Sequence, residues 1–140
     1  METRSCQVHK LVADTCLIAG GRVLLVRYKD TSRYDGQEGW FLPDDFLLHL
    51  EHPEDAARRI LLEQIHVSPP QLTLSHIESF DGDAWHLIFH YRAQLAEIPT
   101  LDPGENLRDA EWFALEALPA ASDVAHHGWA LDVIRKTVEG

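Results

Sequence analysis

Side chains that can bind a metal ion gather between residues 44 and 66 of this chain: Asp44, Asp45, His49, Glu51, Glu63 and His66. Carboxylate oxygens are the ligands that Mg²⁺ prefers, whereas histidine combined with carboxylate suits Mn²⁺ or Zn²⁺ better. The same residue types have ordinary structural uses, because aspartate forms turns and a lone glutamate on a helix is usually a surface charge. A metal site and a set of structural polar groups are therefore both open interpretations of this segment.

Residues 53–65 are expected to form the helix that presents part of this set. Pro53 suits the first helical position, and Glu54 and Asp55 follow where the helix dipole favours negative charge. Apolar residues recur at every fourth position and predict a stripe that packs against a core; they are Ala57, Leu61 and Ile65.

One face of this helix places two polar side chains beside an apolar one. Ile60, Glu63 and Gln64 lie three and four positions apart, and residues at that spacing are neighbours on a helix. Glu63 offers a carboxylate, Gln64 a neutral carbonyl oxygen, and Ile60 no ligand. Glu63 also follows Arg59 by four residues, a spacing that favours an intrahelical ion pair. As it stands, this face predicts weak cation binding.

The remaining segments predict the elements around the helix. Strands are expected at residues 9–18, 22–28, 40–42, 71–80, 85–95 and 109–113, and a second helix at 125–138. Gly20 and Gly21 supply the turn of a first hairpin. The second helix should bury Trp129, Leu131, Val133 and Ile134. The order β-β-β-α-β-β-β-α describes a mixed sheet with helices on both faces, an α/β/α sandwich.

The stretch from Gly39 to Val67 reads GWFLPDDFLLHLEHPEDAARRILLEQIHV. Its Trp-x-Leu-Pro approach, spaced glutamate and Ala-Ala-Arg-Arg helix resemble the box of the Nudix hydrolases, which ends in Arg-Glu-hydrophobic-x-Glu-Glu-x-Gly-hydrophobic. The positions that match are Glu51, Arg59, Leu61, Glu63 and Val67, and those that depart are Asp45, Ile60, Gln64 and His66. The early hairpin, the later hairpin and residues 110–113 (Ala-Glu-Trp-Phe) extend the resemblance over most of the chain.

The resemblance implies one Nudix-like α/β/α domain with a mixed sheet over residues 1–140. Family members hydrolyse a diphosphate linked to another group, usually a nucleoside, with the help of Mg²⁺ or Mn²⁺. By position, the catalytic roles fall to Glu63, Glu51 and Arg59, and the metal roles to Glu63, Gln64 and Asp45. Glu51 and Arg59 match a pair that ties the family's loop to its helix, so we expect a salt bridge between them.

Departures from the family pattern concentrate where the cation would bind. Ile60 and Gln64 replace two of the three helical glutamates, Asp44-Asp45 and Leu50 stand where the family has glycines, and His66 replaces a helix-ending glycine that favours left-handed backbone. The residues that match the family in packing are retained. We therefore expect a preserved fold in which ordinary magnesium-dependent pyrophosphohydrolase activity is weak or lost.

Other side chains offer a place for a nucleotide. Stacking on an aromatic ring beside an arginine holds a base with little sequence preference, and the candidates are Tyr28, Arg33, Tyr34, Trp40 and Trp85. Trp40 and Trp85 lie in expected strands, so a place in the core is the alternative. A carboxylate outside the box often completes the family's site, and the candidates for it are Glu78, Asp81, Asp83 and Glu105.

Some histidines and cysteines carry no metal prediction. His86 and His90 lie four residues apart on one expected strand, roughly 13 Å at ~3.3 Å per residue, too far to share an ion. His126 and His127 are adjacent on an expected helix and point about 100° apart. Cys6 and Cys16 have no zinc-type spacing and are expected to pack as small apolar residues.

Composition restricts the partners. The 140 residues carry a formal charge of −11, and such a surface repels duplex nucleic acid. No apolar run reaches the ~18 residues of a membrane span, so a cytoplasmic protein is expected. The expected ligand is a small nucleotide-like molecule, and a homodimer is one expected assembly because dimers are common among such relatives.

Two hypotheses of different class follow. The chain is either a divergent hydrolase that uses Mg²⁺ or Mn²⁺, or a non-catalytic module without a cofactor. Such a module would bind a nucleotide-like ligand or another protein through the same cleft.

Overall fold

The computed structural model describes residues 9–82 and 84–139, so the predictions for Cys6 and Asp83 lie outside the described residues. The strands are β1 (His9–Ala19), β2 (Arg22–Tyr28), β3 (Asp44–Phe46), β4 (Thr73–Asp81), β5 (Trp85–Leu95) and β6 (Leu107–Ala114). The helices are α1 (Pro53–Ile65) and α2 (Ala125–Glu139), and short 3-10 turns lie at η1 (Ser32–Tyr34) and η2 (Ala121–Asp123). The predicted order of strands and helices is confirmed.

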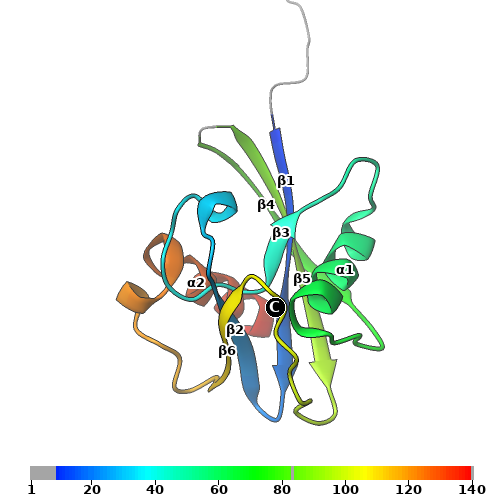
Figure 1. Cartoon of the computed structure of the whole chain (residues 1–140), viewed down its shortest axis with the longest axis vertical. Helices are drawn as coiled ribbons and strands as arrows, with labels where there is room; N and C mark the ends of the chain where they lie inside the picture. Colours follow the sequence, from blue (N-terminus) through cyan, green and yellow to red (C-terminus); the bar gives the residue numbers. More distant parts are fainter. Residues whose placement is uncertain (1–8, 83, 140) are drawn as a thin grey trace, which may run out of the picture.

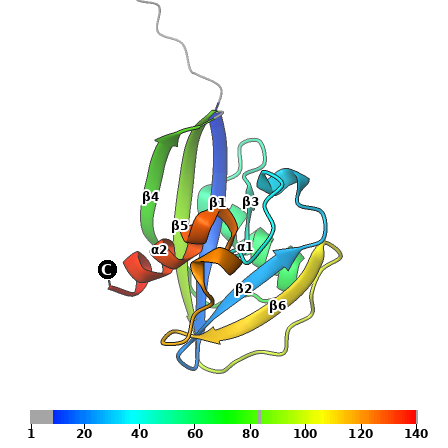
Figure 2. The same ribbon diagram turned by 90° about the vertical axis from the view of Figure 1, so that its left-hand side faces the viewer.

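The strands form a mixed sheet in the order β4-β5-β1-β2-β6, with β3 paired to β1. Strand β1 is the hub, because it pairs in parallel with β5 along its whole length and antiparallel with both β2 and β3. Helices α1 and α2 cover opposite faces of the sheet (Figures 1 and 2). The predicted α/β/α sandwich is confirmed.

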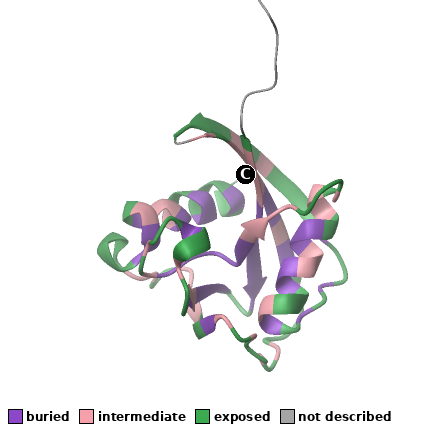
Figure 3. Ribbon diagram, turned by 45° about the horizontal axis from the view of Figure 1, so that its top comes forward, coloured by how far each residue is buried: buried purple, intermediate pink, exposed green. Residues whose placement is uncertain are grey.

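Two apolar clusters hold the helices to the sheet. The cluster under α1 contains the predicted stripe of Ala57, Leu61 and Ile65, each with no exposed surface. The cluster under α2 contains Val133 and Ile134, each 2% exposed. Trp129 and Leu131, also predicted to be buried, are half-buried at its margin. Burial of one such aliphatic side chain contributes about 1.5–3 kcal/mol, so these inner faces fix the layers. Figure 3 shows them as buried, whereas β4 is largely exposed.

Helix α1 is capped at both ends by histidines. The His52 Nδ1 accepts a hydrogen bond from the Glu54 backbone N–H at 3.1 Å, and Pro53 occupies the first turn. His66 ends the helix with φ 55° and ψ 41°, so the left-handed backbone expected there is observed without glycine. The helix therefore begins and ends where the sequence predicted.

The strand predicted at residues 40–42 is wrong. Phe41 makes only an isolated bridge to Val26 on β2, while Trp40 makes an isolated parallel bridge to Val124, just before α2. Because the two successive residues pair with different segments, they form no continuous ladder. Pro43 cannot extend one either, since it has no backbone N–H. The strand begins instead at Asp44, where β3 pairs with Asp14 on β1.

The start of α2 is not a regular helix. His126, His127 and Gly128 have positive φ of 53°, 56° and 88°. A Cβ on Gly128 would lie 2.9 Å from the Cβ of Ala121, so this tight turn requires glycine. The expected helical geometry of the two histidines is therefore wrong. None of the helices in the described ranges is both long and apolar enough to span a bilayer.

Candidate functional site

Arg59 is the centre of a clamp between α1 and the loop that leads into it. Its Nε and Nη2 donate to the two carboxylate oxygens of Glu51 at 2.9 and 3.1 Å, and Nη2 also donates to the Phe46 carbonyl at 2.9 Å. Its Nη1 donates to Glu63 Oε1 at 2.6 Å. The predicted salt bridge between Glu51 and Arg59 is confirmed. One guanidinium thus joins the end of β3, the loop and the third turn of the helix.

The Glu51 carboxylate is fully committed to this clamp. Beyond the two bonds from Arg59, Oε1 accepts the backbone N–H of Leu48 at 3.0 Å. The hydrogen bonds from Arg59 lower the pKa of Glu51 below its ordinary value, because they favour the charged form. Leu50, which stands where the resemblance has glycine, adopts φ 65° with 91% of its surface exposed. The clamp therefore holds a loop whose backbone is strained at that position.

Gln64 belongs to a second, partly buried network. Its Nε2 donates to the Asp44 carbonyl at 2.9 Å, and its Oε1 accepts the Tyr28 hydroxyl at 3.0 Å. The Tyr28 oxygen also accepts the Asp44 backbone N–H at 3.1 Å. Both ends of the Gln64 amide are consequently occupied by bonds that join β2, β3 and α1.

Two tyrosines and a buried carboxyl group complete this network. The Tyr28 and Tyr34 rings stack in parallel with centroids 3.8 Å apart. Burial raises the pKa of both hydroxyls, so both remain neutral donors at ordinary pH. Asp44 is 8% exposed, and burial followed by the nearby Asp14 and Asp45 carboxylates raises its pKa well above the ordinary value.

A cleft with a volume of about 510 Å³ lies on the α2 side of the sheet. Its floor is formed by β1 and β5 through Val12 and Ile88, and its walls come from the 29–43 loop, β3, the turn after β4 and the start of α2. The aromatic side chains that line it are Tyr34, Phe41, Phe46, Phe80 and Trp129, and the charged ones are Lys10, Arg33, Asp35, Asp44 and Asp45. This mixture suits a flat ligand that carries polar groups.

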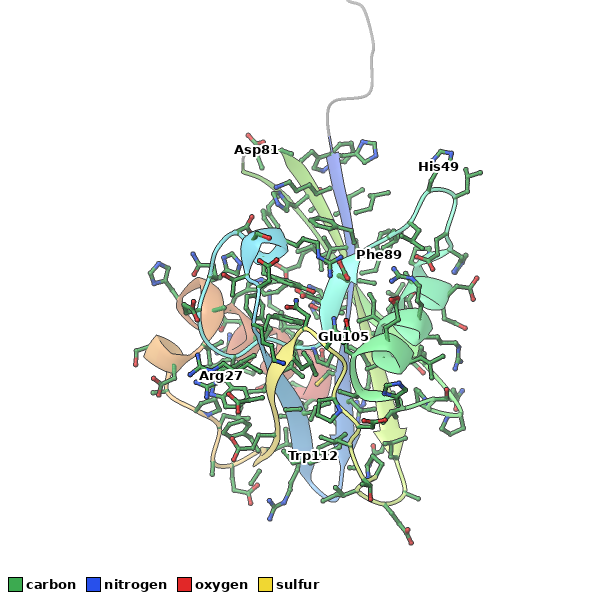
Figure 4. The ribbon with its side chains drawn as sticks, viewed as in Figure 1. Arg27, His49, Asp81, Phe89, Glu105 and Trp112 are labelled. Carbon is green, nitrogen blue, oxygen red and sulfur yellow. The ribbon has the colours of Figure 1, made fainter. Side chains whose placement is uncertain are left out.

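A smaller pocket of about 160 Å³ lies beside α1. Carboxylates from three different segments line it, namely Asp45, Glu63 and Glu105. Glu105 reaches it from the loop before β6 (Figure 4), which is docked on α1 by the Gly104 N–H bond to the Gln64 carbonyl at 2.7 Å. Arg33, Tyr34 and Asp45 line both pockets, so the two pockets lie next to each other at these residues.

A family model described as the NUDIX domain matches residues 9–133. The chain belongs to the Nudix family. The resemblance found in the box therefore extends over the whole sandwich.

Solved structures share the Nudix fold at low sequence identity. A MutT/nudix family protein from Enterococcus faecalis is 21% identical with a TM-score of 0.78, and the match covers 99% of this chain but 64% of that one, so this chain spans less than two thirds of it. A MutT NUDIX hydrolase from Burkholderia pseudomallei is 21% identical with a TM-score of 0.76, covering 92% of this chain and 98% of that one. The NUDIX domain of Shewanella oneidensis NrtR, complexed with ADP ribose, is 20% identical with a TM-score of 0.76 over 94% of this chain and 88% of that one. No curated protein matches the sequence.

The box residues of this Nudix chain do not fit the cation that the family uses. Ile60 is 1% exposed and packs in the core. The Gln64 amide is hydrogen-bonded to the Tyr28 hydroxyl and the Asp44 carbonyl, and the Glu63 carboxylate is paired with Arg59. Over residues 9–82 and 84–139, only one trio of metal-binding side chains brings its ligand atoms within 4.8 Å of one another, and it lies outside the box. The carboxylates of the smaller pocket thus share a lining without converging on a point.

Three of the predicted ligand-binding residues line a pocket, and the other two, Trp40 and Trp85, line neither. Arg33 and Tyr34 line the large cleft, and Tyr28 lines only the smaller pocket. Trp40 is 8% exposed and packs against Phe113 in the α2 core, with Arg27 over its ring at 4.6 Å. Trp85 is 41% exposed and donates to Ser79 Oγ at 2.9 Å, outside both linings.

The remaining candidates are spread over the surface and the sheet. Asp45 accepts the Phe46 N–H at 2.8 Å and pairs with Arg33 at 3.3 Å. His49 lies at the exposed tip of the loop before α1 (Figure 4). His66 Nδ1 bonds the Asp102 carbonyl at 2.8 Å. Asp81 ends β4, and Glu78 faces His90 at 2.7 Å.

Phe80, His86 and His126 are among the cleft residues that sequence reasoning missed. The Phe80 and His86 rings stack with centroids 4.9 Å apart across the β4–β5 hairpin. The alternation of β5 places His86 and Ile88 on one face, which could have been read from the sequence. Nothing in the sequence indicates that the start of α2 brings His126 to the same cleft.

Replacing Glu51 by Gln tests the clamp. We expect a loss of about 1–3 kcal/mol in the free energy of unfolding at pH 7, because charge-assisted bonds to Arg59 are weakened. A carboxylate with a lowered folded pKa stabilises the fold above its unfolded pKa, near the ordinary 4.5, and loses that contribution as pH falls through the folded value. The difference between Glu51→Gln and the natural chain in urea denaturation should therefore shrink below about pH 4.5.

The matched control is Glu54→Gln, because Glu54 forms an exposed ion pair with Arg58 at 3.6 Å on the same helix. It should change stability by less than about 0.5 kcal/mol. Equal effects of the two substitutions would show that the clamp contributes no more than a surface pair.

Replacing Gln64 by Glu tests whether this position is structural. A carboxylate there would face the Asp44 carbonyl without the bond that Nε2 now makes. We expect a loss of about 1–3 kcal/mol in urea denaturation at pH 7. Gln71→Glu, at an exposed position before β4, adds the same charge and should be nearly neutral. A Gln64→Glu variant as stable as Gln71→Glu would refute this network.

Proposed function

We propose that this Nudix chain binds a nucleotide-like small molecule in the 510 Å³ cleft and that its magnesium-dependent hydrolysis of diphosphates is weak or lost. The observation that carries the proposal is that two α1 residues at positions of the family's metal-binding glutamates have structural contacts instead. Ile60 and Gln64 serve the core and the Tyr28–Asp44 network, respectively. Positions that would supply negative charge for a dication instead stabilise the fold.

The composition of the cleft supports a nucleotide-like ligand. Phe80 is 40% exposed, which is unusual for a large aromatic side chain, and its ring offers a stacking surface above the apolar floor. Arg33 lines both pockets with a half-exposed guanidinium, which can bind a phosphate group. The NUDIX domain of Shewanella oneidensis NrtR, which has the same fold, is complexed with ADP ribose. ADP ribose is therefore a suitable first probe.

A residual hydrolase is the second candidate function. It is favoured by the approach of Asp45, Glu63 and Glu105 to the smaller pocket, since carboxylate oxygens suit Mg²⁺ or Mn²⁺. In that case Glu63 would be the principal ligand, with Asp45 and Gln64 as helpers, and the Glu51–Arg59 clamp would position the helix. The binding module needs no cofactor.

Ligand binding can be tested by calorimetric titration of ADP ribose in the presence of a chelator. We expect binding by the natural chain and a loss of affinity of about tenfold or more in Arg33→Ala, because a charge-assisted phosphate contact is removed. Arg135→Ala is the matched control, since Arg135 is similarly exposed and pairs with Asp132 on α2. Equal affinity in both variants, or no binding to the natural chain, would count against the cleft.

Catalysis can be tested by product release from ADP ribose and nucleoside diphosphate derivatives with Mg²⁺, Mn²⁺ or no metal. We expect rates near background, because the helix presents one carboxylate, which Arg59 already holds, where the family presents three. A hydrolase with the complete set of box glutamates serves as the positive control. Robust magnesium-dependent turnover by the natural chain would overturn the weak-or-lost part of the proposal and favour the residual hydrolase.

The Ile60→Glu/Gln64→Glu double variant asks whether the missing charges are the defect. We expect a detectable gain in turnover if this variant folds. Because Ile60 is 1% exposed, its circular dichroism and melting must be checked before its rate is interpreted. A folded but inactive double variant would move the defect to the loop from Asp44 to Leu50.

A further inference from the structure

A cluster of polar side chains lies on β4, β5 and β1, on the face that α2 covers and outside the box. His76 and His90 are direct partners across the β4–β5 ladder, and Glu78 lies two residues further along β4 on the same face. Their ligand atoms all lie within 4.8 Å of one another. The His90 Nε2 is 2.7 Å from Glu78 Oε1, and its Nδ1 is 2.7 Å from Asp14 Oδ1.

Two atoms of the cluster lack the partners that buried polar atoms normally have. The Nε2 of His76 and the Oδ2 of Asp14 are both buried without a hydrogen bond. Asp14 is only 1% exposed, so its carboxylate cannot rely on water. A buried polar atom left unsatisfied costs about 1–3 kcal/mol, and such atoms call for a specific explanation.

We propose that His76, Glu78 and His90 form a binding site for a divalent transition metal ion, best suited to Zn²⁺, with Asp14 as the positioning residue behind His90. Two imidazole nitrogens and one carboxylate oxygen match the ligand set of open zinc sites, in which a fourth position is left for water or another ligand. Mg²⁺ prefers oxygen ligands and is disfavoured by this set. The site is separate from the box and does not depend on the proposed function.

The present geometry requires only small side-chain movements to accept the ion. Zinc bonds of about 2.0–2.1 Å in a tetrahedron place the ligand atoms roughly 3.3 Å apart. The contact between Glu78 and His90 would open from 2.7 Å, and the longer separations, none above 4.8 Å, would close. The strand β4 lies at the edge of the sheet and Glu78 is 25% exposed, so an ion has a path from solvent.

Asp14 gives His90 the orientation that a ligand histidine needs. Metal-binding histidines commonly donate their second N–H to a carboxylate, which fixes the tautomer and directs the free lone pair at the ion. The Asp14 bond to Nδ1 leaves Nε2 directed toward Glu78. With a dication bound, ionised Asp14 and Glu78 together would balance its charge, which would offset the cost of burying an ionised Asp14.

The alternative is a metal-free ion network, and it defines the opposite outcome of the test. Burial lowers the pKa of His90, but the hydrogen bonds and charges of Asp14 and Glu78 outweigh it and raise that pKa above its ordinary value. An imidazolium between two carboxylates would satisfy Glu78 and one oxygen of Asp14. It would leave the buried Nε2 of His76 without a hydrogen-bond partner.

The site adjoins the ligand cleft without lining it. His90 follows Ile88 on the same face of β5, and the Trp129 ring lies 5.5 Å from His90 while it also lines the cleft. A bound ion would therefore stiffen the wall that α2 and β5 share.

The experiment is calorimetric titration of chelator-treated protein with Zn²⁺, together with Co²⁺ substitution followed by visible absorption. We expect one zinc ion per chain and the absorption of four- or five-coordinate Co²⁺. His76→Ala and Glu78→Gln should each weaken zinc binding at least tenfold and remove the Co²⁺ bands. Asp14→Asn should weaken binding about 10–100-fold, as loss of such a supporting carboxylate does.

Two control variants separate this site from other sources of binding. His49→Ala removes an exposed histidine of the loop before α1 (Figure 4), whereas the cluster lies on β4 and β5, so the zinc affinity should stay unchanged. Glu63→Gln should also leave the zinc affinity unchanged. A loss of zinc binding in this variant would assign the ion to the box and not to the cluster. His76→Ala lies on an exposed edge strand and is expected to fold even if Asp14→Asn does not. Absence of zinc binding by the natural chain, or equal affinity in His76→Ala and His49→Ala, would overturn the proposal and assign the cluster to the metal-free network.

Discussion

The guanidinium of Arg59 is the contact on which the arrangement of this protein's box depends. It binds both oxygens of Glu51, the Phe46 carbonyl and one oxygen of Glu63, and so joins β3, the following loop and α1. A planar group with several fixed donors can make these bonds together, which a lysine cannot. Arg59 also pairs with Glu63, the remaining glutamate of the helix face. The carboxylate that would otherwise bind a cation therefore helps to hold the fold together.

Around this clamp, positions associated with catalysis in the Nudix family have become structural. Ile60 fills the core under α1, and Gln64 joins Tyr28 and Asp44 in a network with both ends of its amide satisfied. A neutral amide can donate and accept at once, whereas a carboxylate can only accept. The chemistry of this network therefore favours glutamine over the family's glutamate, independently of any ligand.

On the side of the sheet that α2 covers, polar side chains lie beside apolar and aromatic ones in a cleft. There the cleft combines apolar strands with Arg33, Phe80 and the turn at His126. The buried pair of Asp14 and His90 lies beside the cleft without lining it. Strand β1 connects the two regions, because Asp14 pairs with Asp44 across one ladder and with His90 across the other. Polar groups that are distant in sequence thus form a continuous row through the centre of the fold.

The sequence by itself determined the order of the elements and the limits of α1, because these follow from local capping and periodicity. The salt bridge between Glu51 and Arg59 could be predicted from the sequence only through its resemblance to the Nudix box. Only the tertiary structure decided the role of Gln64, the burial of Trp40, the displacement of the third strand to Asp44 and the meeting of His76 with Glu78 and His90. His86 and His90 are too far apart along one strand, and the sequence offered no means of pairing His90 with the neighbouring strand. Strand register and layer contacts bring together residues that no local pattern connects, and burial then decides which polar groups can reach a ligand.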